Sequence, residues 1–254
     1  FHASTKIESI VPNSNVILLS LPTPMDNENI PDYSALKSVC EQLGDLLEFN
    51  SLVVVESTIE PGFVENELIQ IIESGKKHLI AGENFSIGVC PETANPGEIM
   101  NDFTKLPRLV GAIDDETRKK IIQLYKHVFP VELIPMSDCK TANAVKLTTN
   151  VFRDVNIAFV NQLALLFDKL GVDTLEVLEA AKRKYNFQVH YPGPGVGGPC
   201  LPVNSYQMLN SANQFDSEML SLVKVGREIN ESMPNYVIEF IISGLTEVNK
   251  KISF

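Results

Sequence analysis

The sequence predicts an α/β fold in its first half and an all-helical region with one long helix in its second half. Short, continuous apolar runs, such as 16–20 and 52–55, are typical of strands buried on both faces of a parallel sheet. Helical patterns separate these runs, and such alternation implies a sheet with right-handed crossovers. Residues 140–170 contain no glycine or proline and repeat apolar residues at helical spacing, which indicates the long helix.

The elements of the first half follow in chain order. The expected strands are 16–20, 52–55, 85–89, 108–110 and 131–134, and the expected helices are 33–48, 60–73 and 115–128. In the second half, Asp138 is a suitable N-cap for the long helix, Gly171 is a C′ residue that ends it, and Asp173 begins a capping box for the next helix. Two further helices are expected at 218–230 and 234–248.

Composition excludes several function classes. The chain has 254 residues, 44% of them apolar, which is enough for one large domain or two smaller ones. A net charge of -11 argues against a nucleic-acid binder, which needs a basic face. No apolar run approaches about 18 residues, so no membrane span is expected. The four cysteines lack metal-site spacing, which favours reduced thiols in a cytoplasmic protein, and the histidines suggest no metal site.

Cys200 follows a loop, Tyr191-Pro-Gly-Pro-Gly-Val-Gly-Gly-Pro199, in which glycine and proline dominate. Such a backbone is tight and poorly shielded by side chains. Pro202 then opens an amphipathic stretch, as a first-turn helix proline does, and a helix N-terminus favours a thiolate. The sequence therefore predicts a nucleophilic cysteine, while a buried structural cysteine is the alternative.

Polar groups elsewhere are less specific. Lys146 and Asn150 are four residues apart and share one face of the long helix, although such residues are commonly solvated. Thr23, Thr58 and Glu92 lie in turns directly after expected strands, where ligands bind to open α/β sheets. Ordinary turn and capping chemistry explains these turns equally well.

Together these segments resemble the nucleotide-sugar 6-dehydrogenase family, which includes the UDP-glucose and UDP-N-acetylmannosamine dehydrogenases. The matching segments, in family order, are Leu21-Pro-Thr-Pro24, Glu56-Ser-Thr-Ile-Glu-Pro-Gly62, Cys90-Pro-Glu92, Val145-Lys-Leu-Thr-Thr-Asn150, Arg153-Asp-Val-Asn156, the loop from Gly193 to Pro202, and Arg227-Glu-Ile-Asn-Glu-Ser-Met-Pro234. The cysteine loop is closer to the N-acetylhexosamine branch than to the UDP-glucose branch.

The resemblance implies a partial Rossmann-like sheet and a cytoplasmic enzyme of polysaccharide biosynthesis. The implied reaction oxidises the C6 alcohol of a UDP-sugar, a UDP-N-acetylhexosamine or UDP-glucose, to a carboxylate with two NAD⁺. A thiohemiacetal and then a thioester would form on the cysteine, which splits a difficult oxidation into easier steps. A homodimer through the long helix is also implied.

The same resemblance assigns roles to residues. Cys200 would attack the aldehyde, and Lys146 and Asn150 would stabilise the oxyanion. Glu92 and Thr58 would lie near the sugar C6 and position the hydrolytic water. The remaining assignments are Thr23 and Thr58 at the dinucleotide, and Tyr191, Gly197, Glu92, Lys146 and Asn150 at the sugar.

Two residues depart from the family pattern: Asn204, and Pro199, where the N-acetylhexosamine branch commonly has a histidine. Asn204 stands where the family carries an aspartate that helps to activate water, and an amide cannot accept a proton as a carboxylate does. Slow thioester hydrolysis, or another residue in that role, is therefore expected.

The ends of the chain suggest an incomplete enzyme. The G-x-G-x-x-G phosphate loop of a dinucleotide-binding domain is not found after an expected strand in this sequence, and Gly193 to Gly198, which has the spacing, does not follow a strand inside a βαβ unit. We therefore expect residues 1–138 to be the back part of an NAD-binding domain that binds NAD⁺ poorly by itself. Residues 139–249 would form a central helical domain for dimerisation and the catalytic cysteine, and 250–254 would begin a C-terminal nucleotide-sugar-binding domain.

Two other readings stay open. In the first, the chain is a catalytically silent fragment or dimerisation module. In the second, it is a two-electron dehydrogenase of the hydroxyacid type that needs no thiol.

Overall fold

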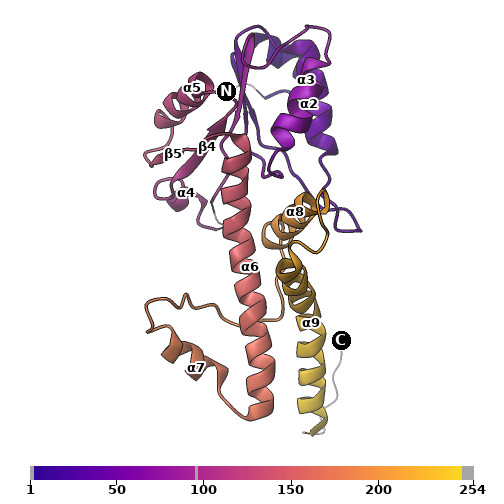
Figure 1. Cartoon of the computed structure of the whole chain (residues 1–254), viewed down its shortest axis with the longest axis vertical. Coiled ribbons are helices and arrows are strands. Elements are labelled where there is room, and N and C mark those ends of the chain that lie inside the picture. Colours follow the sequence, from indigo (N-terminus) through magenta and orange to yellow (C-terminus); the bar gives the residue numbers. More distant parts are fainter. Residues whose placement is uncertain (1–2, 95–96, 248–254) are drawn as a thin grey trace. The chain divides into compact units, whose positions relative to one another are not determined.

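The computed structural model describes residues 3–94 and 97–247. They form two compact units, Phe1–Thr148 and Thr149–Phe254, and α6 runs from the first into the second. The elements in chain order (Figure 1) are α1 (Ile7–Ile10), the 3-10 helix η1 (Val11–Asn13), β1 (Val16–Leu19), α2 (Ser34–Leu46), β2 (Ser51–Val55), the π-helix η2 (Val64–Leu68), α3 (Ile69–Glu73), β3 (Phe85–Val89), α4 (Ile99–Asp102), β4 (Arg108–Ala112), α5 (Asp115–Lys126), β5 (Leu133–Pro135), α6 (Cys139–Leu170), α7 (Thr174–Ala181), α8 (Leu201–Asn213) and α9 (Ser221–Glu247).

The first unit contains a sheet with the strand order β1-β2-β3-β4-β5. β1, β2 and β3 are parallel neighbours, and β4 and β5 are parallel to each other. The predicted α/β fold with a mostly parallel sheet is therefore confirmed. β3 and β4, however, pair in antiparallel fashion. A parallel neighbour needs a crossover, usually a helix that spans a layer, whereas the described part of the β3–β4 connection carries just the four-residue α4.

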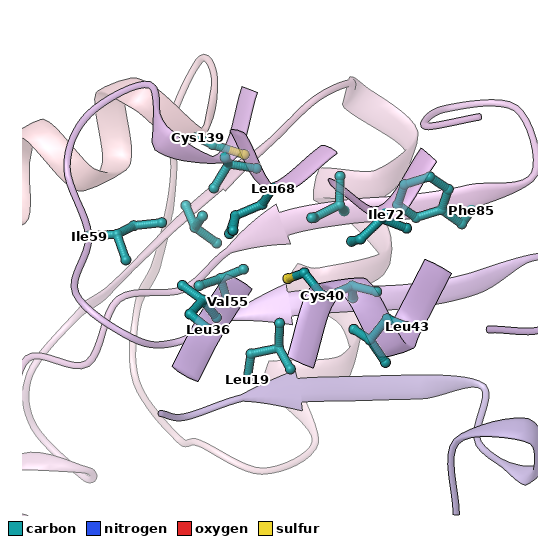
Figure 2. Close-up of a cluster of buried hydrophobic side chains, with 14 of the residues drawn as sticks. Leu19, Leu36, Cys40, Leu43, Val55, Ile59, Leu68, Ile72, Phe85 and Cys139 are labelled. Carbon is teal, nitrogen blue, oxygen red and sulfur yellow. The ribbon is translucent and has the colours of Figure 1, made fainter. Parts of the chain in front are cut away.

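Strand β2 lies in the core along its whole length, because every one of its side chains is buried. Its side chains alternate between the two faces of the sheet, as the two-residue period of a strand requires. Val53 and Val55 pack in the cluster that includes residues of α2 and α3, part of which Figure 2 shows. Leu52 and Val54 pack in a second cluster with Ile121 of α5. Burying a Val or Leu side chain contributes about 1.5–3 kcal/mol, so this apolar run fixes the sheet between two helical layers.

The expected helix ends are confirmed at several points. The Asp138 carboxylate accepts the Thr141 backbone N–H at 2.6 Å and so caps α6. Gly171, with φ +68°, ends α6 in the left-handed conformation. Asp173 caps α7 by accepting the N–H groups of Leu175 and Glu176. The helix expected at 60–73 begins later, as η2, because Gly62 turns the chain with φ +91°.

The prediction of two helices at 218–230 and 234–248 was wrong, because α9 is one helix that continues through Pro234. Proline has no N–H for the carbonyl of Asn230 one turn earlier, and its cost within a helix is about 3 kcal/mol. Asn230 and Met233 are both buried in the turn before Pro234, so packing on the N-terminal side of the proline offsets this cost. The strand expected from residue 250 lies outside the described residues. Among those described, no helix is long and apolar enough to cross a membrane.

Candidate active site

Cys200 lies in the second unit, exposed, at the N-cap position of α8. Pro202 is in the first turn of that helix, as its fixed φ predicts. The loop before it needs glycine, because Gly195 and Gly198 have φ values of +111° and +86°. A Cβ atom at Gly197 would have no heavy atom within 4 Å, so the backbone there is open to a ligand. The exposure of Cys200 excludes the alternative of a buried structural cysteine.

The other three cysteines differ from Cys200, because all of them are buried in the first unit. Burial raises the pKa of Cys40 to about 12 and also raises the pKa of Cys139. Burial raises the pKa of Cys90 as well, although the neighbouring Arg108 opposes the shift. These thiols stay protonated at neutral pH and are sealed from reagents, so the accessible nucleophile is Cys200.

A chain of three amides lies beside the first turn of α8. The Asn150 amide donates from Nδ2 to Asn204 Oδ1 at 2.5 Å, and Asn204 Nδ2 donates to Gln207 Oε1 at 3.0 Å. Asn204 and Gln207 are buried, and Asn150 is half-buried. The structure thus brings together two of the predicted site residues, Asn150 and Asn204, and it engages both ends of the Asn204 amide.

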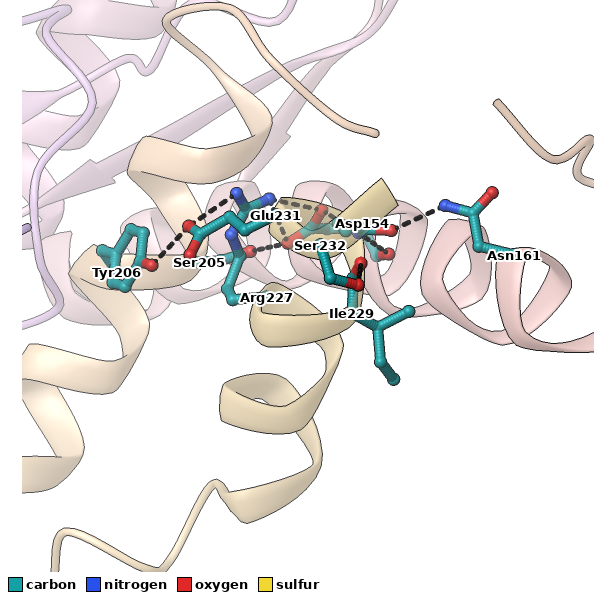
Figure 3. Close-up of polar contacts among 9 residues, drawn as sticks. Asp154, Asn161, Ser205, Tyr206, Arg227, Ile229, Glu231 and Ser232 are labelled. Atoms are coloured by element: carbon teal, nitrogen blue, oxygen red, sulfur yellow. Dashed lines mark hydrogen bonds and ion pairs between the residues drawn. The ribbon is translucent and has the colours of Figure 1, made fainter. Parts of the chain in front are cut away.

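One turn after Asn150 on α6, Asp154 belongs to a buried charge network that joins α6, α8 and α9 (Figure 3). Arg227 Nη1 donates to Asp154 Oδ1 at 3.0 Å, and both side chains are at most 4% exposed. Ser205 Oγ donates to Asp154 Oδ2 at 2.7 Å, and Asn230 Nδ2 donates to Asp154 Oδ1 at 2.8 Å. A buried carboxylate with three such donors is well compensated for the loss of water.

The same network anchors both ends of the cysteine segment, which runs from Gly193 to Ser205. Ser205 is on α8, one turn after Cys200, and is held by Asp154. At the other end, Asn161 Oδ1 accepts the Gly193 N–H at 2.9 Å, while Asn161 Nδ2 donates to Asn230 Oδ1 at 3.0 Å.

Gly195 packs against α9 where Pro234 leaves the Asn230 carbonyl without its helical donor. A Cβ atom at residue 195 would lie 2.6 Å from that carbonyl oxygen and 3.3 Å from Pro234 Cδ. The bend of the chain at residue 195 against Pro234 therefore leaves room for glycine but not for a residue with a Cβ atom.

The first unit holds a separate polar cluster at the carboxyl ends of β2 and β3. Glu56 follows β2 directly, and Glu92 follows β3 by three residues. Arg108 lies between these carboxylates, with Nη1 3.3 Å from Glu92 Oε2 and Nη2 3.6 Å from Glu56 Oε1. The Arg108 side chain is 3% exposed, and that of Glu92 is 40% exposed.

Threonines link two loops at the same edge of the sheet. Thr23 Oγ1 donates to the Thr58 carbonyl at 2.9 Å and so connects the loops after β1 and β2. Ser57 Oγ donates to the Leu21 carbonyl and accepts the Leu21 N–H, each at 2.8 Å, and thus does not cap the following helix. Two predicted cofactor residues, Thr23 and Thr58, are therefore adjacent and half-buried.

The last two predicted positions have different surroundings. Lys146 is half-buried on α6 and is therefore not a freely solvated lysine. Tyr191 is exposed and donates its hydroxyl to Glu179 Oε1 on α7 at 2.6 Å. That hydrogen bond raises the pKa of Tyr191.

Comparison with known proteins matches these elements to two consecutive domains. Residues 1–129 match the profile of the UDP-glucose/GDP-mannose dehydrogenase family, NAD binding domain, and residues 140–232 match the central domain of that family. The chain belongs to the UDP-glucose/GDP-mannose dehydrogenase family.

Relatives of this dehydrogenase family are similar over nearly the whole chain. Protein CapL of Staphylococcus aureus is 34% identical over 91% of this chain and 54% of the relative, and UDP-N-acetyl-D-mannosamine dehydrogenase of Pyrococcus horikoshii is 33% identical over 94% and 56%. The solved structure of UDP-D-ManNAc dehydrogenase from P. horikoshii has a TM-score of 0.89 and 32% identity, covering 97% of this chain and 57% of that one. The chain spans about half the length of these relatives.

Sequence reasoning missed Arg108, Asp154 and Arg227 as parts of the site. Asp154 and Arg227 occur in segments that carry the family resemblance, but no role was predicted for them. For Asp154 and Arg227 the available signal was a charged residue on the apolar face of a helix, because a buried charge needs a partner.

Proposed function

We propose that the protein containing this chain oxidises the C6 alcohol of a UDP-sugar to a carboxylate, with Cys200 as the covalent nucleophile. A UDP-N-acetylhexosamine is the substrate that the relatives' names favour, since UDP-N-acetyl-D-mannosamine and UDP-N-acetyl-D-glucosamine dehydrogenases are among them, and UDP-glucose is the second choice. The exposed thiol at the start of α8, preceded by an open glycine loop, carries this assignment. The four free cysteines support a cytoplasmic setting.

The overall reaction is R–CH2OH + 2 NAD⁺ + H2O → R–COO⁻ + 2 NADH + 3 H⁺. NAD⁺, when bound, would accept one hydride from C6 in each of the two oxidations. The linked loops that carry Thr23 and Thr58, at the carboxyl edge of the sheet, suit the nicotinamide end of such a cofactor. We assign residues 1–138 to the NAD-binding domain and 139–249 to the central domain.

The chain's own residues would act on the sugar as follows. The Cys200 thiolate adds to the aldehyde carbon, and the carbonyl oxygen takes a proton to give a thiohemiacetal. After the second oxidation, water adds to the thioester carbonyl and the C–S bond breaks, which releases the carboxylate and the thiolate. Lys146 and Asn150 would stabilise the oxyanions of both additions, and Glu92 and Thr58 would position the water.

A panel of nucleotide sugars tests the activity. The full-length protein is mixed with NAD⁺ and UDP-N-acetylmannosamine, UDP-N-acetylglucosamine, UDP-N-acetylgalactosamine or UDP-glucose, and NADH and the uronate are both quantified. Two NADH per uronate is the expected ratio. One NADH per product, with no uronate, would show a two-electron dehydrogenase instead.

Asn204 predicts a slow final step. An amide held between Asn150 and Gln207 has no carboxylate with which to activate water, so the acyl group should accumulate on Cys200. We expect Asn204→Asp to hydrolyse the thioester at least about 10-fold faster, because general-base catalysis contributes 10²–10⁴-fold. Intact-mass spectrometry after a single turnover measures the acyl adduct.

Gln207→Glu is the matched control, since it places a carboxylate one turn farther along the same helix. It should leave the lifetime of the adduct unchanged if position matters. Normal turnover of the wild type with no long-lived adduct would contradict the prediction.

We also propose a homodimer through α6. Phe152, Phe159 and Leu166 recur every seven residues and are 49%, 50% and 50% exposed, which makes an apolar stripe along one face. We expect Phe159→Glu to convert the dimer to a monomer in sedimentation velocity. Phe215→Glu, at a 79% exposed position outside this stripe, should stay dimeric. A wild-type monomer would contradict the proposal.

A further inference from the structure

Arg108 owes its position to the antiparallel strand β4. The carboxyl ends of β2 and β3 lie at one edge of the sheet, because these strands are parallel. β4 runs the opposite way beside β3, so its first residue, Arg108, lies at that same edge. The antiparallel direction of β4 therefore places the Arg108 cation at the edge of the sheet where Glu56 follows β2 and Glu92 follows β3.

Aromatic side chains fix the guanidinium there. The Arg108 Cζ atom is 4.4 Å from the ring centroid of Phe129, 5.2 Å from that of Tyr125 and 5.7 Å from that of Phe103. Each such contact with a desolvated cation stabilises it and limits its rotamers. Burial opposes the charged form, but Cys90, Glu92 and Tyr125 favour it, and the balance raises the pKa of Arg108 above its ordinary value.

The two carboxylates beside Arg108 are held in different ways. Glu56 accepts the hydroxyl of Ser20 at 2.6 Å and that of Tyr125 at 2.5 Å, so each of its oxygens has a donor other than the arginine. Glu92 accepts the N–H groups of Thr93 and Ala94 with Oε1, both at 2.6 Å. Among the described residues, Arg108 is the donor to its other oxygen, Oε2.

Any effect of Arg108 on a bound ligand would therefore pass through the Glu92 carboxylate. The arginine is sealed under the rings, whereas two fifths of the Glu92 side chain faces solvent. We propose that Arg108 is a positioning residue, which orients and charge-pairs the Glu92 carboxylate for the hydrolysis of the thioester. This inference rests on the proposed function, in which Glu92 positions the water.

A double-mutant cycle on the full-length protein tests the role, because residues that act together are non-additive. The four members are wild type, Arg108→Met, Glu92→Gln and the double variant. We expect Arg108→Met to lower kcat by about 10–100-fold, as loss of a group that orients a reacting residue does, with little change in KM for the UDP-sugar. In the Glu92→Gln background the same change should have less than about a twofold effect.

Arg108→Lys covers the case in which the methionine variant does not fold. It keeps the charge but not the forked donor, so its kcat should lie between those of wild type and Arg108→Met. In the Glu92→Gln background, Arg108→Lys should have the same kcat as Glu92→Gln alone. Glu56→Gln is the control for the other carboxylate, and a change at Arg108 should keep its full effect in that background.

The results distinguish failure of the proposed role of Arg108 from failure of the proposed function. If wild type makes uronate but the Arg108 variants lose the same factor with and without the Glu92 carboxylate, the arginine is structural and the inference is overturned. If wild type makes no uronate from any sugar of the panel, the proposed function fails first, and the role of Arg108 in it fails with it.

Discussion

Cys200→Ala is expected to abolish uronate formation by the full-length protein. Without the thiolate no thiohemiacetal forms, so the second oxidation has no covalent substrate. Loss of a covalent nucleophile lowers kcat on the order of 10³-fold or more. The first oxidation needs no sulfur, so residual NADH with aldehyde and no carboxylate is the product pattern to measure by mass spectrometry.

Cys40→Ala is the matched control, because it removes a thiol from the buried core of the first unit. It should keep wild-type uronate formation. Iodoacetamide gives a second readout: of the four cysteines in residues 1–254 it should label Cys200 and so inactivate the enzyme, since burial raises the pKa of Cys40 to about 12. Uronate formation by Cys200→Ala at the wild-type rate would refute covalent catalysis by this thiol, whereas full NADH production by both wild type and Cys200→Ala with no uronate from either would favour the two-electron reading.

The strands and most helices could be predicted because their signals are local. A run such as 52–55 is apolar at every position, and the structure buries all of β2 between two helical layers. Cys200 was equally visible, since the glycine and proline residues that expose it are its sequence neighbours. Both kinds of signal lie within a window of a few residues.

The parts that could not be predicted depend on distant residues. The direction of β4 decides that Arg108 joins Glu92, and direction is set by how the connection packs, not by the composition of the strand. Pro234 signals a helix end by local rules, yet buried neighbours carry α9 through it. Asp154 and Arg227 are 73 residues apart, so nothing in either segment alone shows that they pair.

Asp154→Ala is expected to destabilise the second unit by about 3–5 kcal/mol, because it leaves the Arg227 cation buried without its main partner. Ser205 and Asn230 would lose an acceptor at the same time. Chemical denaturation followed by circular dichroism measures the loss as a lower unfolding midpoint.

Asp168→Ala is the control on the same helix, since Asp168 is exposed and accepts one hydrogen bond, from the Tyr236 hydroxyl at 3.2 Å. It should change the unfolding free energy by less than about 1 kcal/mol. The double variant Asp154→Leu with Arg227→Met removes both charges and should be more stable than Asp154→Ala alone, because apolar replacements of a buried pair avoid the unpaired ion. If Asp154→Ala and Asp168→Ala cost the same, the buried network does not hold the helices around the cysteine segment, and the anchoring of Ser205 and Gly193 loses its energetic basis.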